Sequence, residues 1–101
     1  MRITTKEKDI ISFNAKQIFG MNTKVLLFGS RVYDSAKGGD IDLLIIPPGN
    51  APRSEFFTKK FQFIVKVLDS IGDQKIDVII QYPDDNRGII QTAHNEGIRL
   101  C

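Results

Sequence analysis

The sequence predicts an α/β (α+β) fold in which a small mixed sheet is flanked by helices. Three short apolar runs, at residues 24–28, 40–46 and 75–81, have the length and composition of buried strands. Amphipathic segments of helical period lie before and between them, so helices and strands alternate along the chain. The 101 residues are enough for one domain with a single core, which we place at residues 1–101.

The first element is expected to be a helix over residues 5–19. Thr4 and Glu7 have the spacing of a capping box, in which each side chain accepts a hydrogen bond from the other residue's backbone N–H. Apolar residues then recur at helical spacing, at Ile11, Ala15 and Ile18. Gly20 follows as a C-terminal stop.

The chain is expected to turn after the strand at residues 24–28. Residues 31–36 are long enough for one or two helical turns. Lys37-Gly38-Gly39 forms a turn, because paired glycines allow positive φ. The strand at residues 40–46 follows and ends at Pro47-Pro48.

Residues 54–71 form the strongest predicted helix, which ends at Gly72-Asp73. One stripe of apolar residues, which we expect to face the core, has spacings of four and three: Phe57, Phe61, Ile64, Leu68 and Ile71. Phe56 and Phe63 lie off this stripe. The lysines are expected on the solvated face, namely Lys59, Lys60 and Lys66.

The last part of the chain is expected to form a strand, a helix and a short strand. The strand at residues 75–81 is followed by a turn at Pro83-Asp84-Asp85, which offers N-caps for a helix at about residues 86–96. Gly97 ends that helix, and residues 98–100 form a short closing strand.

Three aspartates stand in or beside predicted strands, where Asp is rare. Asp40 and Asp42 are two residues apart, so they point to one face of the strand while Ile41 and Leu43 point to the other, into the core. Asp77 stands among apolar residues of the third strand. If the two strands are neighbours, the three carboxylates converge, and a hard cation such as Mg²⁺ resolves their repulsion.

A structural interpretation of the same aspartates competes with this one. Asp40 would cap its strand after the glycine turn, and Asp42 would be solvated at a sheet edge. Asp77 would pair with Lys75. We favour the metal site, because one Asp in a strand is common and three in this arrangement are not.

Gly29-Ser30 marks the end of the first strand, where a short helix begins. Backbone N–H groups at such a place suit an anion such as phosphate, since glycine allows close approach and the serine hydroxyl adds a donor. Arg31 would add positive charge. The pair of residues is a weak signal alone, and its weight comes from standing eleven residues before Asp40.

Composition and charge exclude several classes of protein. With 42% hydrophobic and 26% charged residues, the chain is not of the disordered, collagen-like or cysteine-scaffold type. The net charge of +2 does not favour a dedicated nucleic-acid-binding protein. The one cysteine, Cys101, allows no disulfide within the chain and fits a reducing, cytoplasmic setting. The polar N-terminus and the short apolar runs indicate neither a signal peptide nor a membrane partner.

Together these motifs resemble those of the DNA polymerase β-like nucleotidyltransferase superfamily. The shared pattern is an apolar strand, Gly29-Ser30, a nine-residue spacer, Asp40-Ile41-Asp42, and Asp77 on a later strand. The small size makes the chain similar to the minimal, HEPN-associated nucleotidyltransferases of prokaryotes, and the resemblance covers about residues 24–100. One position departs from the pattern, since the residue before the Asp-x-Asp pair is often Ser and here is Gly39.

The resemblance implies a polymerase β-like fold and a two-metal mechanism. Asp40 and Asp42 would bind two Mg²⁺ ions, and Asp77 would complete the site and take the proton of the nucleophile. Gly29 and Ser30 would hold the β and γ phosphates of ATP or another nucleoside triphosphate. The product would be a nucleoside monophosphate, such as AMP, joined to an acceptor.

The resemblance also implies a partner, because the minimal proteins are often encoded beside a helical HEPN protein. Some of these pairs act as toxin and antitoxin, and the nucleotidyltransferase silences the toxin by AMPylation. A competing hypothesis is a non-catalytic nucleotide-binding module that neutralises its partner by binding alone. A one-domain antibiotic nucleotidyltransferase is disfavoured, since those enzymes hold the drug with a second domain or a dimer interface. The base, the acceptor and any oligomer stay open.

Overall fold

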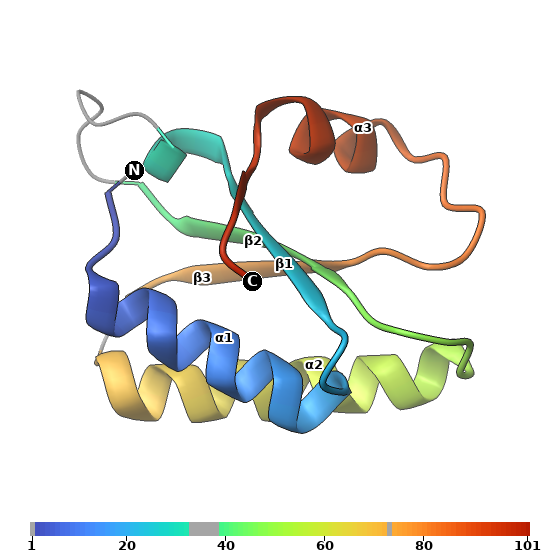
Figure 1. The fold of residues 1–101 in the computed structure, drawn as a ribbon, viewed down its shortest axis with the longest axis horizontal. Helices are drawn as coiled ribbons and strands as arrows, with labels where there is room; N and C mark the ends of the chain where they lie inside the picture. The colour runs from blue at the N-terminus through green and yellow to red at the C-terminus, as the bar shows by residue number, and fades with distance from the viewer. Residues whose placement is uncertain (1, 33–38, 73) are drawn as a thin grey trace.

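The computed structural model describes residues 2–32, 39–72 and 74–101, which form a sheet with helices on both faces (Figure 1). The elements in chain order are α1 (Thr5–Phe19), β1 (Lys24–Phe28), the 3₁₀ segment η1 (Gly29–Val32), β2 (Ile41–Ile46), α2 (Arg53–Ile71), β3 (Ile76–Ile80), α3 (Gly88–Glu96) and β4 (Ile98–Arg99). The predicted helices and strands are confirmed, with boundaries within two residues. Helical turns were expected at residues 31–36 and a turn at residues 37–39, and positions 33–38 lie outside the described residues. Asp73, expected at the end of the long helix, also lies outside them.

The sheet is mixed, with strand order β3-β2-β1-β4. β1 pairs antiparallel with β2 and β4, whereas β2 pairs parallel with β3. A parallel pair needs a long crossover, and α2 supplies it. β2 and β3 are therefore neighbours, which was the condition for the aspartates to meet.

Each strand sends alternate side chains to opposite faces of the sheet. One face packs against α1 and α2, and its strand residues are all buried: Val25, Leu27, Ile41, Leu43, Ile45, Ile76, Val78 and Ile80. The other face carries a smaller cluster beneath α3, formed by Phe28, Leu44, Ile90 and Ala93. Since α3 is only nine residues long and packs on β1 and η1, it leaves part of this second face uncovered.

The capping box predicted for α1 is present. The Thr4 Oγ1 accepts from the Glu7 N–H at 3.0 Å, and the Glu7 carboxylate accepts from the Thr4 N–H at 2.9 Å. Among the described residues, no side chain caps the N-terminus of α3. The expected cap, Asp85, instead accepts hydrogen bonds from the backbone N–H groups of Tyr82 and Arg87, which precede the helix. The helix consequently begins at Gly88, two residues later than expected.

The buried side of α2 agrees only in part with the predicted stripe, whose residues Ile64, Leu68 and Ile71 are half-buried against the main core. Phe56, Phe63 and Val67 are buried, whereas Phe57 and Phe61 are 58% and 53% exposed. Phe63 packs against Phe19 of α1 at 6.1 Å between ring centroids, and Phe56 packs against Tyr82 at 5.9 Å. These contacts rotate the helix away from the expected face.

None of the helices within the described ranges is both long enough and apolar enough to cross a membrane.

Candidate functional site

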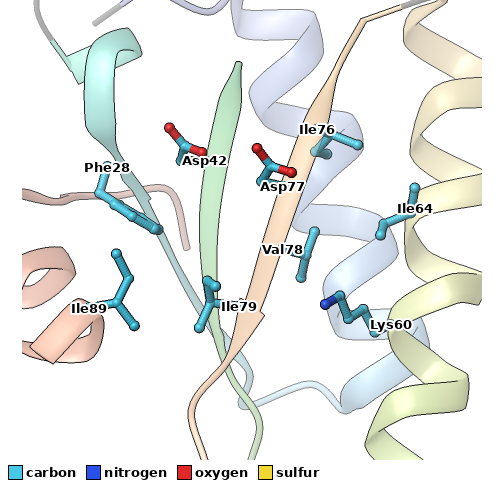
Figure 2. A pocket seen from close by; sticks show the side chains of 9 residues that line it. All are labelled: Phe28, Asp42, Lys60, Ile64, Ile76, Asp77, Val78, Ile79 and Ile89. Atoms are coloured by element: carbon cyan, nitrogen blue, oxygen red, sulfur yellow. The ribbon is translucent and has the colours of Figure 1, made fainter. Parts of the chain in front are cut away.

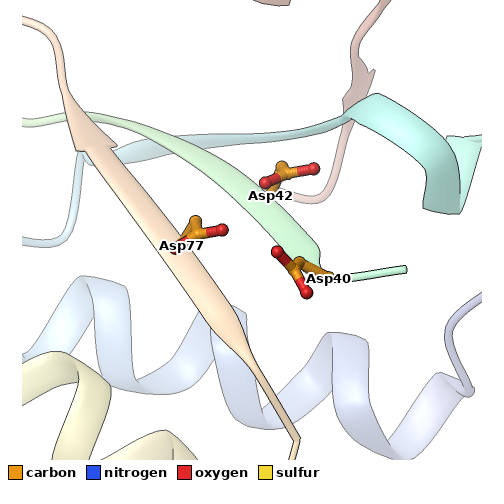
Figure 3. Close-up of side chains that lie close together, drawn as sticks. All are labelled: Asp40, Asp42 and Asp77. Atoms are coloured by element: carbon orange, nitrogen blue, oxygen red, sulfur yellow. The ribbon is translucent and has the colours of Figure 1, made fainter. Parts of the chain in front are cut away.

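Asp42 and Asp77 meet on the partly uncovered face of the sheet. In the parallel pairing of β2 and β3 they occupy the same register position, and both side chains point to the side away from α1 and α2 (Figure 2). Asp40 stands just before β2, two residues from Asp42, and turns toward the same point (Figure 3). One carboxylate oxygen from each of the three residues lies within 4.8 Å of those of the others.

The convergence of like charges changes the acidity of the site. Burial raises the pKa of the Asp42 carboxyl, and the neighbouring Asp77 and Asp40 carboxylates raise it further. Asp42 is half-buried while Asp77 is exposed, so Asp42 has less access than Asp77 to water that screens its charge. Three carboxylates at this spacing need a compensating cation when all are ionised.

Lys75 provides part of that compensation. Its ammonium lies 3.3 Å from the Asp40 Oδ2, and its own pKa is raised by the hydrogen bond and attraction to Asp40, then by attraction to Asp77. The structural interpretation paired Lys75 with Asp77, which is wrong in detail, since the ion pair is with Asp40. The Lys75 side chain is 73% exposed, so water screens this pair.

The donor set fits a hard divalent cation. All three ligands are carboxylate oxygens, the donors that Mg²⁺ prefers, and they come from two rigid neighbouring strands. Mg²⁺ retains several coordination positions for water or substrate phosphates when few protein ligands hold it. The site is therefore suited to a metal that also binds a phosphorylated substrate.

Gly29 lies directly against the cluster. A Cβ built at this glycine would collide with the Asp42 carboxylate, and its φ of +75° is rarely adopted by other residues. A side chain here would therefore displace Asp42. Gly29 therefore brings backbone close to the carboxylates.

Ser30 and Gly39 are also in contact. A Cβ at Gly39 would collide with the Ser30 Oγ, and the φ of Gly39 is +91°. The departure from the family pattern at Gly39 thus has a physical reason, because glycine makes room for the Ser30 hydroxyl. The contact holds Ser30 next to the residue that precedes Asp40.

Arg31 is bound into the chain around the site. Its guanidinium donates to the carbonyls of Gly39 at 3.3 Å and Arg2 at 2.9 Å, and to the Gln74 side chain at 3.2 Å. Gln74 in turn donates to the Glu7 carboxylate. Arg31 therefore fixes η1 to the start of the chain and to the segment before β3, and its role toward nucleotide stays a prediction.

A pocket of about 390 Å³ lies beside Asp42 and Asp77 (Figure 2). Apart from these two carboxylates and Lys60, its lining is apolar: Phe28, Ile64, Ile76, Val78, Ile79 and Ile89. The sequence prediction placed Lys60 on the solvated face of α2, which is wrong, since Lys60 is half-buried and lines the pocket. Nothing in the helical period marks this lysine, because its place depends on how α2 is rotated.

Comparison with known protein families gives a match over most of the chain. A family model described as a nucleotidyltransferase domain matches residues 8–100, nearly the whole chain. The small mixed α/β architecture of the described residues, with α1, α2 and α3 around the β3-β2-β1-β4 sheet, is consistent with the fold of that family. No curated protein matches the chain.

Proposed function

The chain belongs to the nucleotidyltransferase domain family, and on that premise we propose that it is a Mg²⁺-dependent enzyme that transfers AMP from ATP to an acceptor. The observation that carries the proposal is the convergence of Asp40, Asp42 and Asp77 within 4.8 Å. The raised pKa of Asp42 supports it, because the repulsion among the three carboxylates is a local electrostatic cost that a bound divalent cation would offset.

In the proposed reaction an acceptor hydroxyl attacks the α-phosphorus of ATP. A new P–O bond forms to the acceptor, the bond to the β-phosphate bridging oxygen breaks, and pyrophosphate leaves. Two Mg²⁺ ions held by Asp40, Asp42 and Asp77 would stabilise the charge on the phosphates and increase the acidity of the attacking hydroxyl. Asp77, the most exposed of the three, would take the proton of that hydroxyl.

The phosphates of the leaving group would lie along η1. Gly29 has no side chain between its backbone and Asp42, and Ser30 is held beside Gly39, so both stand at the edge of the carboxylate cluster. We assign them to the β and γ phosphates. Arg31 lies behind them and would add positive charge without leaving its own hydrogen bonds.

The finer assignment concerns the acceptor. From the resemblance to the minimal nucleotidyltransferases, we propose that it is a HEPN protein, that the two form a toxin–antitoxin pair, and that they act in the cytoplasm. AMPylation of the HEPN protein would silence it. This assignment stands or falls separately from the chemistry at the carboxylates.

The test is transfer of label from ATP to the co-expressed product of the neighbouring gene. With Mg²⁺ and α-labelled ATP, the wild-type protein should label that acceptor, and Asp77→Ala should reduce the rate by about a hundredfold or more with its circular dichroism unchanged. Asp9→Ala is the matched control, since Asp9 is an exposed aspartate of α1 far along the chain from the cluster. Equal labelling by wild type and Asp77→Ala would refute the catalytic role of Asp77.

A second candidate is the non-catalytic module that neutralises a partner by binding alone. The observation in its favour is the exposed apolar surface of α2, which the catalytic proposal does not use. The triple variant Asp40→Asn, Asp42→Asn, Asp77→Asn separates the two functions. Loss of neutralisation supports the enzyme, and retained neutralisation supports the module.

A further inference from the structure

The solvent side of α2 carries an apolar row with opposite charges at its two ends. Residues four apart lie along one ridge of a helix, and all members of this row are exposed: Arg53, Phe57, Phe61, Val65 and Asp69. Val65 is 65% exposed, more than either phenylalanine. The adjoining row is polar throughout, with Ser54, Thr58, Gln62, Lys66 and Ser70. The apolar residues are thus gathered on one ridge rather than scattered over the helix.

The centre of the row is already ordered. The rings of Phe57 and Phe61 pack edge to face, with centroids 5.0 Å apart and planes at 80°. Two aromatic side chains in edge-to-face contact lose less side-chain entropy when they are covered, because each restricts the other. Exposed, ordered aromatics of this kind are typical of the centre of protein interfaces.

The row is complementary to itself in the antiparallel direction. If two copies of α2 cross with Phe61 at the centre, Phe57 of each copy faces Val65 of the other, and Arg53 faces Asp69. A parallel crossing would instead bring Arg53 next to Arg53. The ends of the row, eight residues or about 12 Å from Phe61, can meet only if the two axes are close to antiparallel, inclined by about 20° as in helix bundles.

The charged ends of the row are available for this pairing. Among residues 2–32, 39–72 and 74–101, neither Arg53 nor Asp69 has an ion-pair partner. The Arg53 guanidinium lies 4.3 Å from the centre of the Tyr82 ring, a cation–π contact that leaves its N–H groups without an ion pair to any described residue. A guanidinium in a cation–π contact keeps N–H donors that can bond a carboxylate.

We propose that this row is a homodimer surface, on which α2 of one copy packs antiparallel against α2 of a second copy around Phe61. The proposal does not depend on the activity of the carboxylate cluster. In this proposal a second copy of the chain, rather than a toxin partner, covers the exposed apolar residues of α2. Because Lys60 and Ile64 reach the pocket from the same helix, the second copy would lie near the pocket's α2 side.

The first test is sedimentation equilibrium of the full chain over a range of concentrations. The wild type should dimerise reversibly below about 1 mM, since a single helix face gives a small and weak interface. Phe61→Asp should weaken dimerisation by about tenfold or more, because it places two like charges at the symmetric centre. Phe13→Asp is the matched control, since Phe13 of α1 is 62% exposed and lies outside the row, and it should leave dimerisation unchanged.

The second test addresses the register through the charges. Arg53→Asp alone and Asp69→Arg alone should each weaken dimerisation several-fold, and the double variant should return it to within about twofold of wild type. If the single variants weakened dimerisation by damaging the fold, the double variant would be at least as weak, so its rescue would show that the two charges pair. A monomeric wild type, a dimer insensitive to Phe61→Asp, or a double variant no better than the single ones would each overturn the proposal.

Discussion

The two faces of the sheet carry different kinds of residue, although the same strands form both. Toward α1 and α2, every residue of β2 and β3 is buried and apolar. Toward α3, the same strands carry Leu44 and Ile79 at one end and Asp42 and Asp77 at the other. Adjacent residues such as Leu43 and Asp42 therefore meet opposite environments, one without water and one with like charges close by.

Alternate residues of one strand therefore have different roles: one set stabilises the fold, and the other carries the carboxylates of the candidate site. Apolar burial on the helix-covered face stabilises the sheet and fixes the strand register. That rigid register then holds Asp42 and Asp77 opposite each other although they repel. Truncating a core side chain on one face and removing a carboxylate charge on the other should consequently change stability in opposite directions.

The largest change in stability is expected on the helix-covered face. Leu43 is fully buried between the sheet and the helices, so Leu43→Ala should reduce the free energy of unfolding by about 2–5 kcal/mol, measured by urea denaturation. Leu43→Met is the control and should cost less than about 1.5 kcal/mol, since it keeps most of the volume. A cost for Leu43→Ala below that of Leu43→Met would contradict the assignment of the main core to this face.

The next largest effect is expected where backbone approaches the carboxylates. Gly29→Ala should destabilise by about 1–3 kcal/mol, because it combines a positive φ with a collision at Asp42. Gly49→Ala is the matched control, with φ of +70° and no atom within 4 Å of the added Cβ. The difference in destabilisation between Gly29→Ala and Gly49→Ala therefore measures the collision with Asp42, because both positions have a positive φ. Equal costs for the two variants would mean that Asp42 moves aside freely.

Strand parity in the sequence predicted which faces the aspartates share, but not that the two strands are neighbours. Asp40 and Asp42 had to share a face, and Asp77 joined them once β3 lay beside β2. The adjacency itself could not be derived from spacing, since it depends on the crossover through α2. The resemblance to a known family supplied what the local pattern left open.

The rotation of α2 could not be predicted for a different reason. The helix has apolar residues at overlapping spacings, so Phe56, Phe63 and Val67 form a second stripe beside the predicted one. The choice between them is made by contacts with Phe19 and Tyr82, which lie far away in the sequence. The same rotation moved Lys60 to the pocket and exposed Phe57 and Phe61.

On the carboxylate face, removing a charge should stabilise the metal-free protein. Asp42→Asn should raise the free energy of unfolding at pH 7 by about 0.5–1 kcal/mol, because it removes a half-buried charge that Asp77 and Asp40 repel. Asp9→Asn on α1 should change it by less than about 0.5 kcal/mol. Urea denaturation in the presence of a chelator measures both. A destabilised Asp42→Asn protein would contradict the electrostatic cost assigned to this face.

The pH dependence of the same variant has a definite sign. The folded-state pKa of Asp42 is raised above its ordinary 3.8, so the native state binds the proton more tightly than the unfolded chain does. Protonation of Asp42 therefore stabilises the fold fully at pH values below the unfolded-state pKa, and this stabilisation is lost as the pH rises through the folded-state pKa. The advantage of Asp42→Asn should therefore fade toward pH 3.8, and Mg²⁺ should stabilise the wild type more than the variant.

The smallest expected effect concerns the charge that partly neutralises the cluster. Lys75 lies 3.3 Å from Asp40 and competes with a divalent cation for the same carboxylates, so Lys75→Met should strengthen Mg²⁺ or Mn²⁺ binding by about two- to fivefold. Lys75→Arg keeps the charge and should bind the metal as the wild type does. Isothermal titration of the protein with each metal, without nucleotide, measures this. Weaker metal binding by Lys75→Met would mean that Lys75 organises the carboxylates rather than competing for them, and the cation site would then have to include residues beyond the aspartates.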